Sequence, residues 1–176
     1  MFGRRKVAAL AAEFLGTGVL TLAVLSVQRS TIGVPYFVAI AAGLVMAMLI
    51  FIFGGISGGH ANPAITLALW TARKVGTLTA VLYVIMQMLG AWAAYGLYTY
   101  FVNSPLQPIG GTYTGRILVA EAVGTFVLVF GIMSIASPQA SLGALDALPV
   151  ALLLFGIGLS LGGPTGFAVN PARDLG

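Results

Sequence analysis

The sequence contains no cysteine and has few charged residues. The absence of cysteine excludes disulfides, thiolate metal sites and cysteine nucleophiles. Charged residues make up 7% of the 176 residues, with eight Lys and Arg and four Asp and Glu, whereas a soluble domain has about 25%. So few charges cannot solvate a water-facing surface, which excludes ordinary soluble enzymes, disordered tails and coiled coils. The cations form no clustered face, so we expect no nucleic-acid partner.

Apolar residues dominate the rest of the chain. Hydrophobic residues make up 59% of the sequence, and the mean hydropathy is +1.04. A hydrocarbon core of about 30 Å requires roughly 20 apolar residues per helix. Five runs are of about this length: residues 7–27, 34–56, 79–102, 117–136 and 147–161. The sequence therefore predicts an all-α membrane protein that crosses the bilayer several times.

The distribution of cations predicts the orientation in the membrane. The first apolar run is longer than a signal-peptide core, and further spans follow it, so we interpret it as a retained anchor. Cytoplasmic loops are enriched in Lys and Arg. A cytoplasmic N-terminus places five cations inside: Arg4, Arg5, Lys6, Arg73 and Lys74. It leaves three outside: Arg29, Arg116 and Arg173. We therefore predict a cell-membrane protein with a cytoplasmic N-terminus.

Two apolar stretches contain glycine and polar residues and cannot form whole spans. The first, residues 54–71, reads GGISGGHANPAITLALWT. Its last part, residues 63–71, would form a helix of about 13 Å at ~1.5 Å per residue. The second, residues 162–176, reads GGPTGFAVNPARDLG and begins in the same way. Each stretch is predicted to form a half-helix that reaches only part of the way across the bilayer.

Two pairs of similar segments indicate an internal duplication. AEFLGTGVLTL, beginning at Ala12, resembles AEAVGTFVLVF, beginning at Ala120. HANPA, beginning at His60, resembles AVNPA, beginning at Ala168. Both pairs have an offset of 108 residues, and two different landmarks rarely share one offset by chance. We interpret residues 1–176 as one transmembrane domain made of two repeats, about 1–108 and an incomplete 109–176.

The number of spans per repeat predicts an inverted arrangement. Three full spans are an odd number, so the second repeat crosses the membrane in the opposite sense and the two half-helices meet near the midplane. The counterpart of the span at 79–102 would fall beyond residue 176. The second half-helix, expected from 171 to about 179, would also be cut. We therefore expect a C-terminally incomplete chain that lacks its sixth span.

The same three residues open both half-helices: Asn62, Pro63 and Ala64, and Asn170, Pro171 and Ala172. Asparagine is a favoured N-cap, proline suits the first helical position, and alanine is the best helix former. The glycine-rich backbone before each motif must be buried in protein or line water. Two helix N-termini that face each other, each carrying about +0.5 charge, would repel cations, including hydronium. We expect the Asn62 and Asn170 amides to donate hydrogen bonds to passing neutral solutes.

These paired motifs resemble those of the major intrinsic protein family, the aquaporins and glycerol facilitators. The resemblance covers nearly the whole chain and implies a homotetramer of inverted-repeat helical bundles with two re-entrant half-helices. It implies that the pore is lined by the carbonyl groups of four residues before each Asn: Gly58, Gly59, His60 and Ala61, and Gly166, Phe167, Ala168 and Val169. It also implies a selectivity constriction of four residues: Ala42, Gly158, Phe167 and Arg173.

The constriction resembles neither subgroup of the family completely. Asp174, together with TGFA before the second Asn-Pro-Ala, resembles the glycerol facilitators. Ala42 occupies the position of a tryptophan in glycerol facilitators and a phenylalanine in water channels. With Gly158 opposite, we expect two walls of the constriction to carry almost no side chain and the mouth to be wide. Some plant members of the family with a similarly small residue pass metalloid acids or urea, so water, glycerol, urea and metalloid acids all stay open as solutes.

Glu13 and Glu121 lie at equivalent positions within spans, where an acidic side chain costs about 2.5 to 3.5 kcal/mol on insertion. One interpretation is a proton-coupled site. The family resemblance implies instead that each carboxylate holds the loop before a half-helix, and its presence in both repeats favours this role. Gln87 either holds the first loop or bonds a neighbouring helix. His60 is the only histidine, and we interpret it as a bonded loop residue rather than a pH gate, with no metal site.

The sequence thus predicts a passive channel for small neutral solutes, glycerol-like polyols or water, that excludes protons and ions. We expect no enzymatic activity and no cofactor, and the partners are the solutes, water and the lipid bilayer. Coupled secondary transporters also use inverted repeats and broken helices. An ion-coupled transporter is therefore one alternative, and a non-conducting fragment is another. We expect conduction from the full-length protein, because without a sixth span one side of the pore would face lipid.

Overall fold

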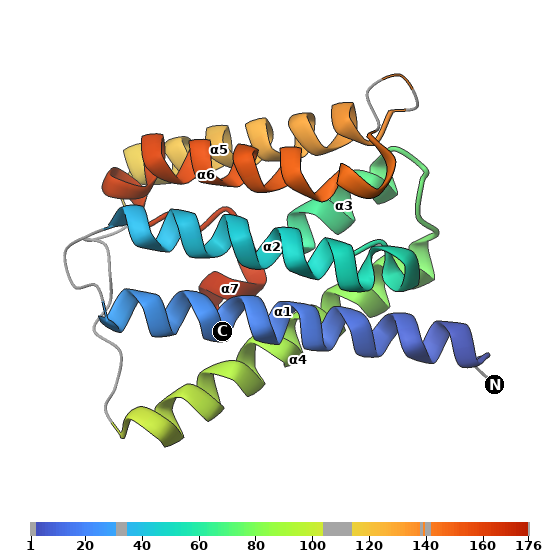
Figure 1. The fold of residues 1–176 in the computed structure, drawn as a ribbon, viewed down its shortest axis with the longest axis horizontal. Helices are drawn as coiled ribbons and strands as arrows, with labels where there is room; N and C mark the ends of the chain where they lie inside the picture. Colours follow the sequence, from blue (N-terminus) through green and yellow to red (C-terminus); the bar gives the residue numbers. More distant parts are fainter. Residues whose placement is uncertain (1–2, 31–34, 104–113, 138, 140–141, 176) are drawn as a thin grey trace.

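The computed structural model describes residues 3–30, 35–103, 114–137, 139 and 142–175, and its regular elements are helices (Figure 1). They are α1 (Arg4–Ser30), α2 (Pro35–Ser57), α3 (Pro63–Thr71), α4 (Thr77–Val102), α5 (Gly115–Ile135), the short 3-10 helix η1 (Gly143–Leu145), α6 (Ala147–Thr165) and α7 (Pro171–Leu175). The described residues contain no strand. The all-α class predicted from the sequence is confirmed.

Four of these helices, α1, α2, α4 and α5, are apolar and long enough to cross a membrane. They correspond to the first four predicted spans. The fifth predicted span is α6, whose 19 residues reach about 28 Å at ~1.5 Å per residue. The helix α3 has nine residues and extends over Pro63–Thr71, which are the predicted bounds of the first half-helix. The described part of the second half-helix is α7, from Pro171 to Leu175.

Close helix pairs build the bundle. The most extensive contacts join α1 to α4 and α2 to α6. Glycine makes both approaches possible. A Cβ at Gly90 on α4 would overlap the carbonyl oxygen of Phe14 on α1, and a Cβ at Gly43 on α2 would lie 2.8 Å from the carbonyl oxygen of Ala151 on α6. Small residues let membrane helices pack backbone to backbone, where dispersion contacts replace the hydrophobic effect.

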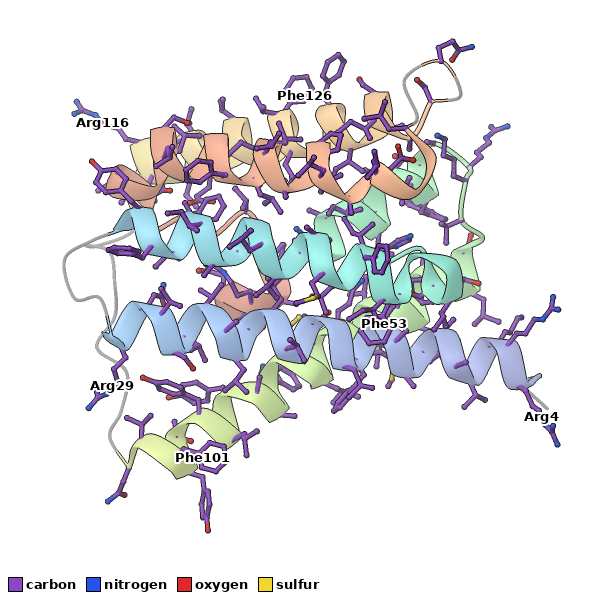
Figure 2. The ribbon with its side chains drawn as sticks, in the orientation of Figure 1. Arg4, Arg29, Phe53, Phe101, Arg116 and Phe126 are labelled. Atoms are coloured by element: carbon purple, nitrogen blue, oxygen red, sulfur yellow. The ribbon has the colours of Figure 1, made fainter. Side chains whose placement is uncertain are left out.

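The two halves of the chain run in opposite directions. Figure 2 shows Arg4, at the start of α1, at one end of the bundle, and Arg116, near the start of α5, at the opposite end. Arg29, near the end of α1, lies at the same end as Arg116 (Figure 2). The helix α1 is therefore antiparallel to α5. The two short helices lie against each other, with α3 also contacting α4 and α5, and α7 also contacting α4 and α1.

The side chains are distributed as a membrane environment requires. Large apolar side chains point outward, among them Phe101 and Phe126, which are 68% and 67% exposed (Figure 2). The interior, in contrast, holds polar side chains, and Glu13 and Gln87 are almost completely buried. A lipid solvent favours this outer surface, while buried polar groups must be bonded inside the bundle. Glu13 and Gln87 bond α3 and the loop before it.

Candidate functional site

The N-termini of α3 and α7 meet inside the bundle through reciprocal hydrogen bonds. The side chain of Asn62 caps α3, since its Oδ1 accepts from the N–H of Ala64 at 2.9 Å. Its Nδ2 donates across to the carbonyl oxygen of Val169 at 2.9 Å. The Nδ2 of Asn170 donates in return to the carbonyl oxygen of Ala61 at 2.9 Å. The two asparagines are 108 residues apart in the sequence. Asn62 thus bonds the loop before α7 (residues 166–169, the second loop), and Asn170 bonds the loop before α3 (residues 58–61, the first loop).

Asn170 also caps its own helix. Its Oδ1 accepts from the N–H of Ala172 at 3.1 Å and from the N–H of Arg173 at 3.3 Å. Each asparagine therefore uses its oxygen within its own half and its nitrogen between the halves. Pro63 and Pro171 occupy the first helical positions, where the missing N–H of proline costs no hydrogen bond.

The residue before each asparagine has a left-handed backbone. Ala61 has φ 44°, and its counterpart Val169 has φ 35°. This region is uncommon for residues other than glycine and is an outlier for a β-branched residue such as valine. The conformation allows each carbonyl group to reach the asparagine of the opposite half. Phe167, at φ 58°, has the same strain two residues earlier in the second loop.

Glu13 supports the first loop through four hydrogen bonds. Its Oε1 accepts from the hydroxyl of Ser57 at 2.6 Å and from the N–H of His60 at 3.0 Å. Its Oε2 accepts from the N–H of Ala61 at 2.8 Å and from Nε2 of Gln87 at 2.7 Å. The carboxylate is 1% exposed, and these donors replace the water that it loses on burial.

Glu121 makes the matching contacts in the second loop. Its two oxygens accept from the N–H of Ala168 at 3.0 Å and from the N–H of Val169 at 2.7 Å. Ala168 and Val169 follow His60 and Ala61 by 108 residues, as Glu121 follows Glu13. The backbone contacts are therefore the same in both halves, while the two side-chain donors described for Glu13 belong to the first half.

Glu13, Gln87 and their hydrogen-bond partners form a network around the first loop, which we call the first-loop network. Three of its residues were not predicted from the sequence: Ser57, Thr66 and Tyr83. Gln87 Nε2 donates to Thr66 Oγ1 at 2.9 Å as well as to Glu13, so Gln87 bonds both the carboxylate and a half-helix. Tyr83 donates its hydroxyl to the carbonyl oxygen of Ser57 at 3.0 Å, and its ring meets that of His60 edge-on at 5.2 Å. One available signal was the four-residue spacing of Tyr83 and Gln87, which places both on one helix face.

His60 is bonded within this network. Its Nδ1 lies 3.0 Å from Thr66 Oγ1. The single hydroxyl hydrogen of Thr66 is directed to the carbonyl oxygen of Asn62 at 3.1 Å, so the hydroxyl oxygen acts as acceptor toward His60 and Gln87. A His60 imidazole that carries a proton on Nδ1 fits this pattern of donors and acceptors. Among the described residues, no group of three or more His, Cys, Asp or Glu residues is placed to hold a metal ion.

Two neighbouring cavities lie beside the half-helices. The smaller, ≈ 30 Å³, is lined by Asn62 and Asn170 together with the predicted constriction residues Ala42, Phe167 and Arg173. The larger, ≈ 160 Å³, is lined by three residues of the first loop, Gly58, Gly59 and His60. Both cavities are lined by Met46 and Ile65, so these two side chains lie where the cavities adjoin.

Gly158 packs closely against a neighbouring helix and a loop side chain. An added Cβ would overlap the Cβ of Ala39 and lie 3.3 Å from Cε1 of Phe167. Glycine here lets α6 approach α2 and lets the Phe167 ring lie close to α6. The expected width of the constriction between Ala42 and Gly158 stays a prediction.

The remaining predicted residues lie around the same region. The guanidinium of Arg173 donates to the carbonyl oxygen of Phe167, and its Cζ lies 6.0 Å from the centre of that ring. Ala168 and Val169 line the smaller cavity. Gly166 ends α6 in a left-handed conformation at φ 78°, and Asp174 is exposed on α7. The structure thus brings the residues around the two asparagines together and leaves Gly158 and Asp174 outside the cavity lining.

Comparison with known proteins identifies the family. The sequence matches the major intrinsic protein family over residues 4–176. It is 36% identical over 193 residues to aquaporin PIP1-3 of Arabidopsis thaliana, covering 99% of this chain and 67% of the relative. It is 40% identical over 148 residues to the glycerol uptake facilitator protein of Bacillus subtilis (strain 168), covering 76% and 54%.

A solved structure agrees with these relatives. The fold matches the X-ray structure of the aquaglyceroporin from Plasmodium falciparum with a TM-score of 0.82 at 25% identity, covering 97% of this chain and 78% of that chain. The chain spans about two thirds of the length of the plant relative. The family predicted from the paired Asn-Pro-Ala motifs is confirmed, and the chain belongs to the major intrinsic protein family.

Proposed function

We propose that the protein is a passive channel for small neutral solutes, water and glycerol-like polyols, and that it excludes ions and protons. One observation carries this proposal: Asn62 and Asn170 bond each other's loops while both line the cavity between the half-helix tips. The relatives support it, since one is named a glycerol uptake facilitator and another an aquaporin. The family is a channel family, and we propose no enzymatic step.

The asparagine amides supply the donors for a solute. An amide nitrogen carries two hydrogens. Among the described contacts, Asn62 and Asn170 each use one of them on a loop carbonyl, which leaves the second for an oxygen atom in the cavity. A water or polyol oxygen that accepts from both amides at once points its own hydrogens away from the half-helix tips. This orientation interrupts a hydrogen-bonded chain of water along which protons would move.

The electrostatics at the same place act against cations. Each helix N-terminus presents a positive partial charge of about +0.5 at its unpaired N–H groups. The α3 and α7 termini face one another through Asn62 and Asn170, and Arg173 lines the same cavity. A cation there would meet positive charge from two helices and a guanidinium, whereas a neutral solute would find donors.

Apolar side chains provide most of the lining of the smaller cavity. Leu20 and Val24 of α1, Leu128 of α5 and Leu154 of α6 line it together with the two asparagines. A polyol has hydroxyl groups that bond donors and carbon atoms that prefer apolar surface. A mainly apolar lining with two amide donors therefore suits this solute class, and water is small enough to pass the same donors.

Acceptors for the solute's own hydroxyl hydrogens come from the loops. The carbonyl oxygens of Ala61 and Val169 already accept the asparagine amides, but a carbonyl oxygen has two lone pairs and can accept a second bond. Gly58, Gly59 and His60 line the larger cavity. We propose that their carbonyl groups continue this row of acceptors, with Arg173 and Phe167 at the constriction.

The two intramembrane carboxylates favour passive transport over ion-coupled transport, because both have a structural role. Glu13 and Glu121 both accept loop N–H groups, so protonation of either would remove a support of the pore loop. A carboxylate that carries coupled protons must change its charge without such a loss. We also propose a homotetramer in the cell membrane with a cytoplasmic N-terminus, as the family resemblance and the cation distribution imply.

Substitution of Ala42 tests the proposed pore. Ala42 is 5% exposed and lines the smaller cavity, so Ala42→Trp would place a large ring in it. We expect glycerol permeability to fall about tenfold more than water permeability, a difference of ~1.4 kcal/mol in barrier height. The measurement is stopped-flow light scattering on proteoliposomes that contain the protein in its full natural length.

Leu44→Trp is the matched control, because Leu44 lies two residues away on α2 but is 66% exposed. This variant should leave both permeabilities unchanged. An unaltered ratio of glycerol to water in Ala42→Trp would show that Ala42 is not at the constriction. Flux that follows an imposed proton or sodium gradient would contradict passive transport itself.

A further inference from the structure

A third cavity, of ≈ 150 Å³, lies between the first turns of α1 and α4 and shares no lining residue with the two cavities of the proposed pore. Arg5, Lys6 and Leu10 line it from α1, and Leu78, Thr79 and Leu82 line it from α4. Both helices are candidate membrane spans, so their first turns lie where the hydrocarbon core gives way to lipid headgroups. The cavity is therefore at headgroup depth.

The lining combines positive charge with apolar surface. Arg5 and Lys6 are exposed side chains of one wall, and the leucines of both helices provide the rest. The N-cap residue of α4 is Gly76, which has no side chain to accept hydrogen bonds from the first N–H groups of this 26-residue helix. These N–H groups therefore add positive potential beside the two cations. This chemistry suits a molecule with an anionic group at one end and an alkyl chain at the other.

We propose that this cavity binds the headgroup of an anionic phospholipid, with the phosphate between Arg5 and Lys6 and the upper part of an acyl chain along Leu78 and Leu82. A free phosphate ion would gain nothing from the leucines, of which Leu78 is 59% exposed. Anionic lipids are enriched at the membrane face that attracts basic segments. A phospholipid therefore fits both the cations and the leucines of this cavity, whereas free phosphate fits the cations alone.

The floor of the cavity connects the lipid site to the proposed pore. Tyr83 lines the cavity and is 6% exposed. Its hydroxyl donates to the carbonyl oxygen of Ser57, and its ring contacts His60, which lines the larger pore cavity. A lipid bound against Tyr83 thus packs on the side chain that positions the first pore loop. Lipid binding should therefore also raise the unfolding temperature.

Native mass spectrometry of the detergent-solubilised full-length protein tests this site. Phosphatidylglycerol and phosphatidylcholine are titrated separately against the wild type and against the double variant Arg5→Gln with Lys6→Gln. We expect the wild type to retain phosphatidylglycerol in preference to phosphatidylcholine. The double variant should bind phosphatidylglycerol about thirtyfold more weakly, which is the effect of two cations near an anionic group. The rise in unfolding temperature with phosphatidylglycerol should be lost in parallel.

The matched control is Arg73→Gln with Lys74→Gln, which removes the same charge from the turn before α4 but from outside the cavity lining. It should change phosphatidylglycerol binding by less than about twofold. Leu82→Trp, which fills the cavity and keeps every charge, should abolish retention. Equal losses in both charge variants, equal binding of the two lipids, or full competition by equimolar inorganic phosphate would each overturn the proposal.

Discussion

At the scale of single residues, the pore loops hold strained backbone against buried carboxylates. Left-handed conformations such as those of Ala61 and Val169 cost about 1–3 kcal/mol each. Glu13 and Glu121 offset this cost, because each accepts the N–H of the strained residue and of the residue before it. The left-handed backbone turns the carbonyl groups of Ala61 and Val169 toward the asparagine of the opposite half. The carboxylates stabilise this backbone and therefore the hydrogen bonds that join the two halves.

Removal of the acceptor should destabilise the first half more than the second. Glu13 accepts from four donors, whereas the contacts described for Glu121 are two backbone N–H groups. In a glutamine variant one oxygen becomes an amide nitrogen, which faces two donors at position 13 but one at position 121. Each buried donor left unpaired costs about 1–3 kcal/mol. We therefore expect Glu13→Gln to lower the unfolding temperature more than Glu121→Gln, measured by tryptophan fluorescence in detergent micelles.

Both variants remove one negative charge, so each serves as the charge-matched control of the other. Equal shifts would show that the additional bonds of Glu13 to Ser57 and Gln87 contribute nothing to stability. A proton-coupled role would instead leave stability nearly unchanged and make solute flux depend on a proton gradient only in the wild type.

The sequence pointed to some residues of this site and missed others. Asn62, Asn170, Glu13 and Glu121 stand out in an apolar sequence because each is polar and repeated at the same offset. Ser57 does have a hydroxyl counterpart, Thr165, at this offset, and the two accept hydrogen bonds from equivalent loop N–H groups. Thr66 and Tyr83 carry no such signal, since hydroxyl side chains in membrane helices often bond their own backbone. Their roles depend on which helices pack together, and the sequence alone does not state that.

At the scale of elements, glycine decides how closely helices pack and where they end. The sequence predicted the end of the fifth span at residue 161, but α6 continues to Thr165 and ends at the left-handed Gly166. Glycine at position 162 therefore did not end the helix. The prediction for α3 was correct because Asn62 caps it and Pro63 fixes its first turn, and both are local signals.

The contact of α1 with α4 gives the element-scale prediction. A Cβ at Gly90 would overlap the carbonyl oxygen of Phe14, so Gly90→Ala must force the two helices apart. Overpacking of this kind costs about 1–3 kcal/mol. Gly96→Ala is the matched control on the same helix, because a Cβ there meets nothing within 4 Å, and it should change the free energy of unfolding by less than about 1 kcal/mol.

Denaturant titration in micelles, followed by tryptophan fluorescence, measures both free energies. Since α1 carries Glu13 and α4 carries Gln87, the separation of these helices in Gly90→Ala should also weaken the first-loop network and reduce solute flux. Similar free energies for the two variants would mean that the close approach at Gly90 is not needed for stability.

At the scale of the whole molecule, the inverted arrangement was predictable from the sequence and the packing around Gly158 was not. An odd number of spans separates the two Asn-Pro-Ala motifs, so the two half-helices must enter the membrane from opposite sides. Counting the spans in the sequence is enough to predict this. The space above Gly158, in contrast, is taken by Ala39 and Phe167, from an earlier helix and a later loop. Such a contact depends on the distances between packed elements and has no counterpart in the local sequence.

The two ends of the bundle differ in charge, and this difference predicts the orientation in the membrane. Arg4, Arg5 and Lys6 begin α1 or lie in its first turn, at the end opposite to Arg29 and Arg116 (Figure 2). Arg73 and Lys74 precede α4, whose first turn shares a cavity with Arg5. Arg173 is bonded to Phe167 inside the bundle. Among the described residues outside the pore, five cations therefore lie at one end and two at the other.

Because cytoplasmic ends attract Lys and Arg, we expect Arg4 inside the cell and Arg116 outside. These 176 residues contain no cysteine, so a cysteine introduced among them is the only one there, and the unsubstituted protein measures the background label. Arg116→Cys should react with a membrane-impermeant maleimide in intact cells, while Arg4→Cys should react only after the cells are broken. Both positions are exposed, so a lack of reaction cannot result from burial. The reverse pattern would place the basic end, and the proposed lipid site with it, on the outer face of the membrane.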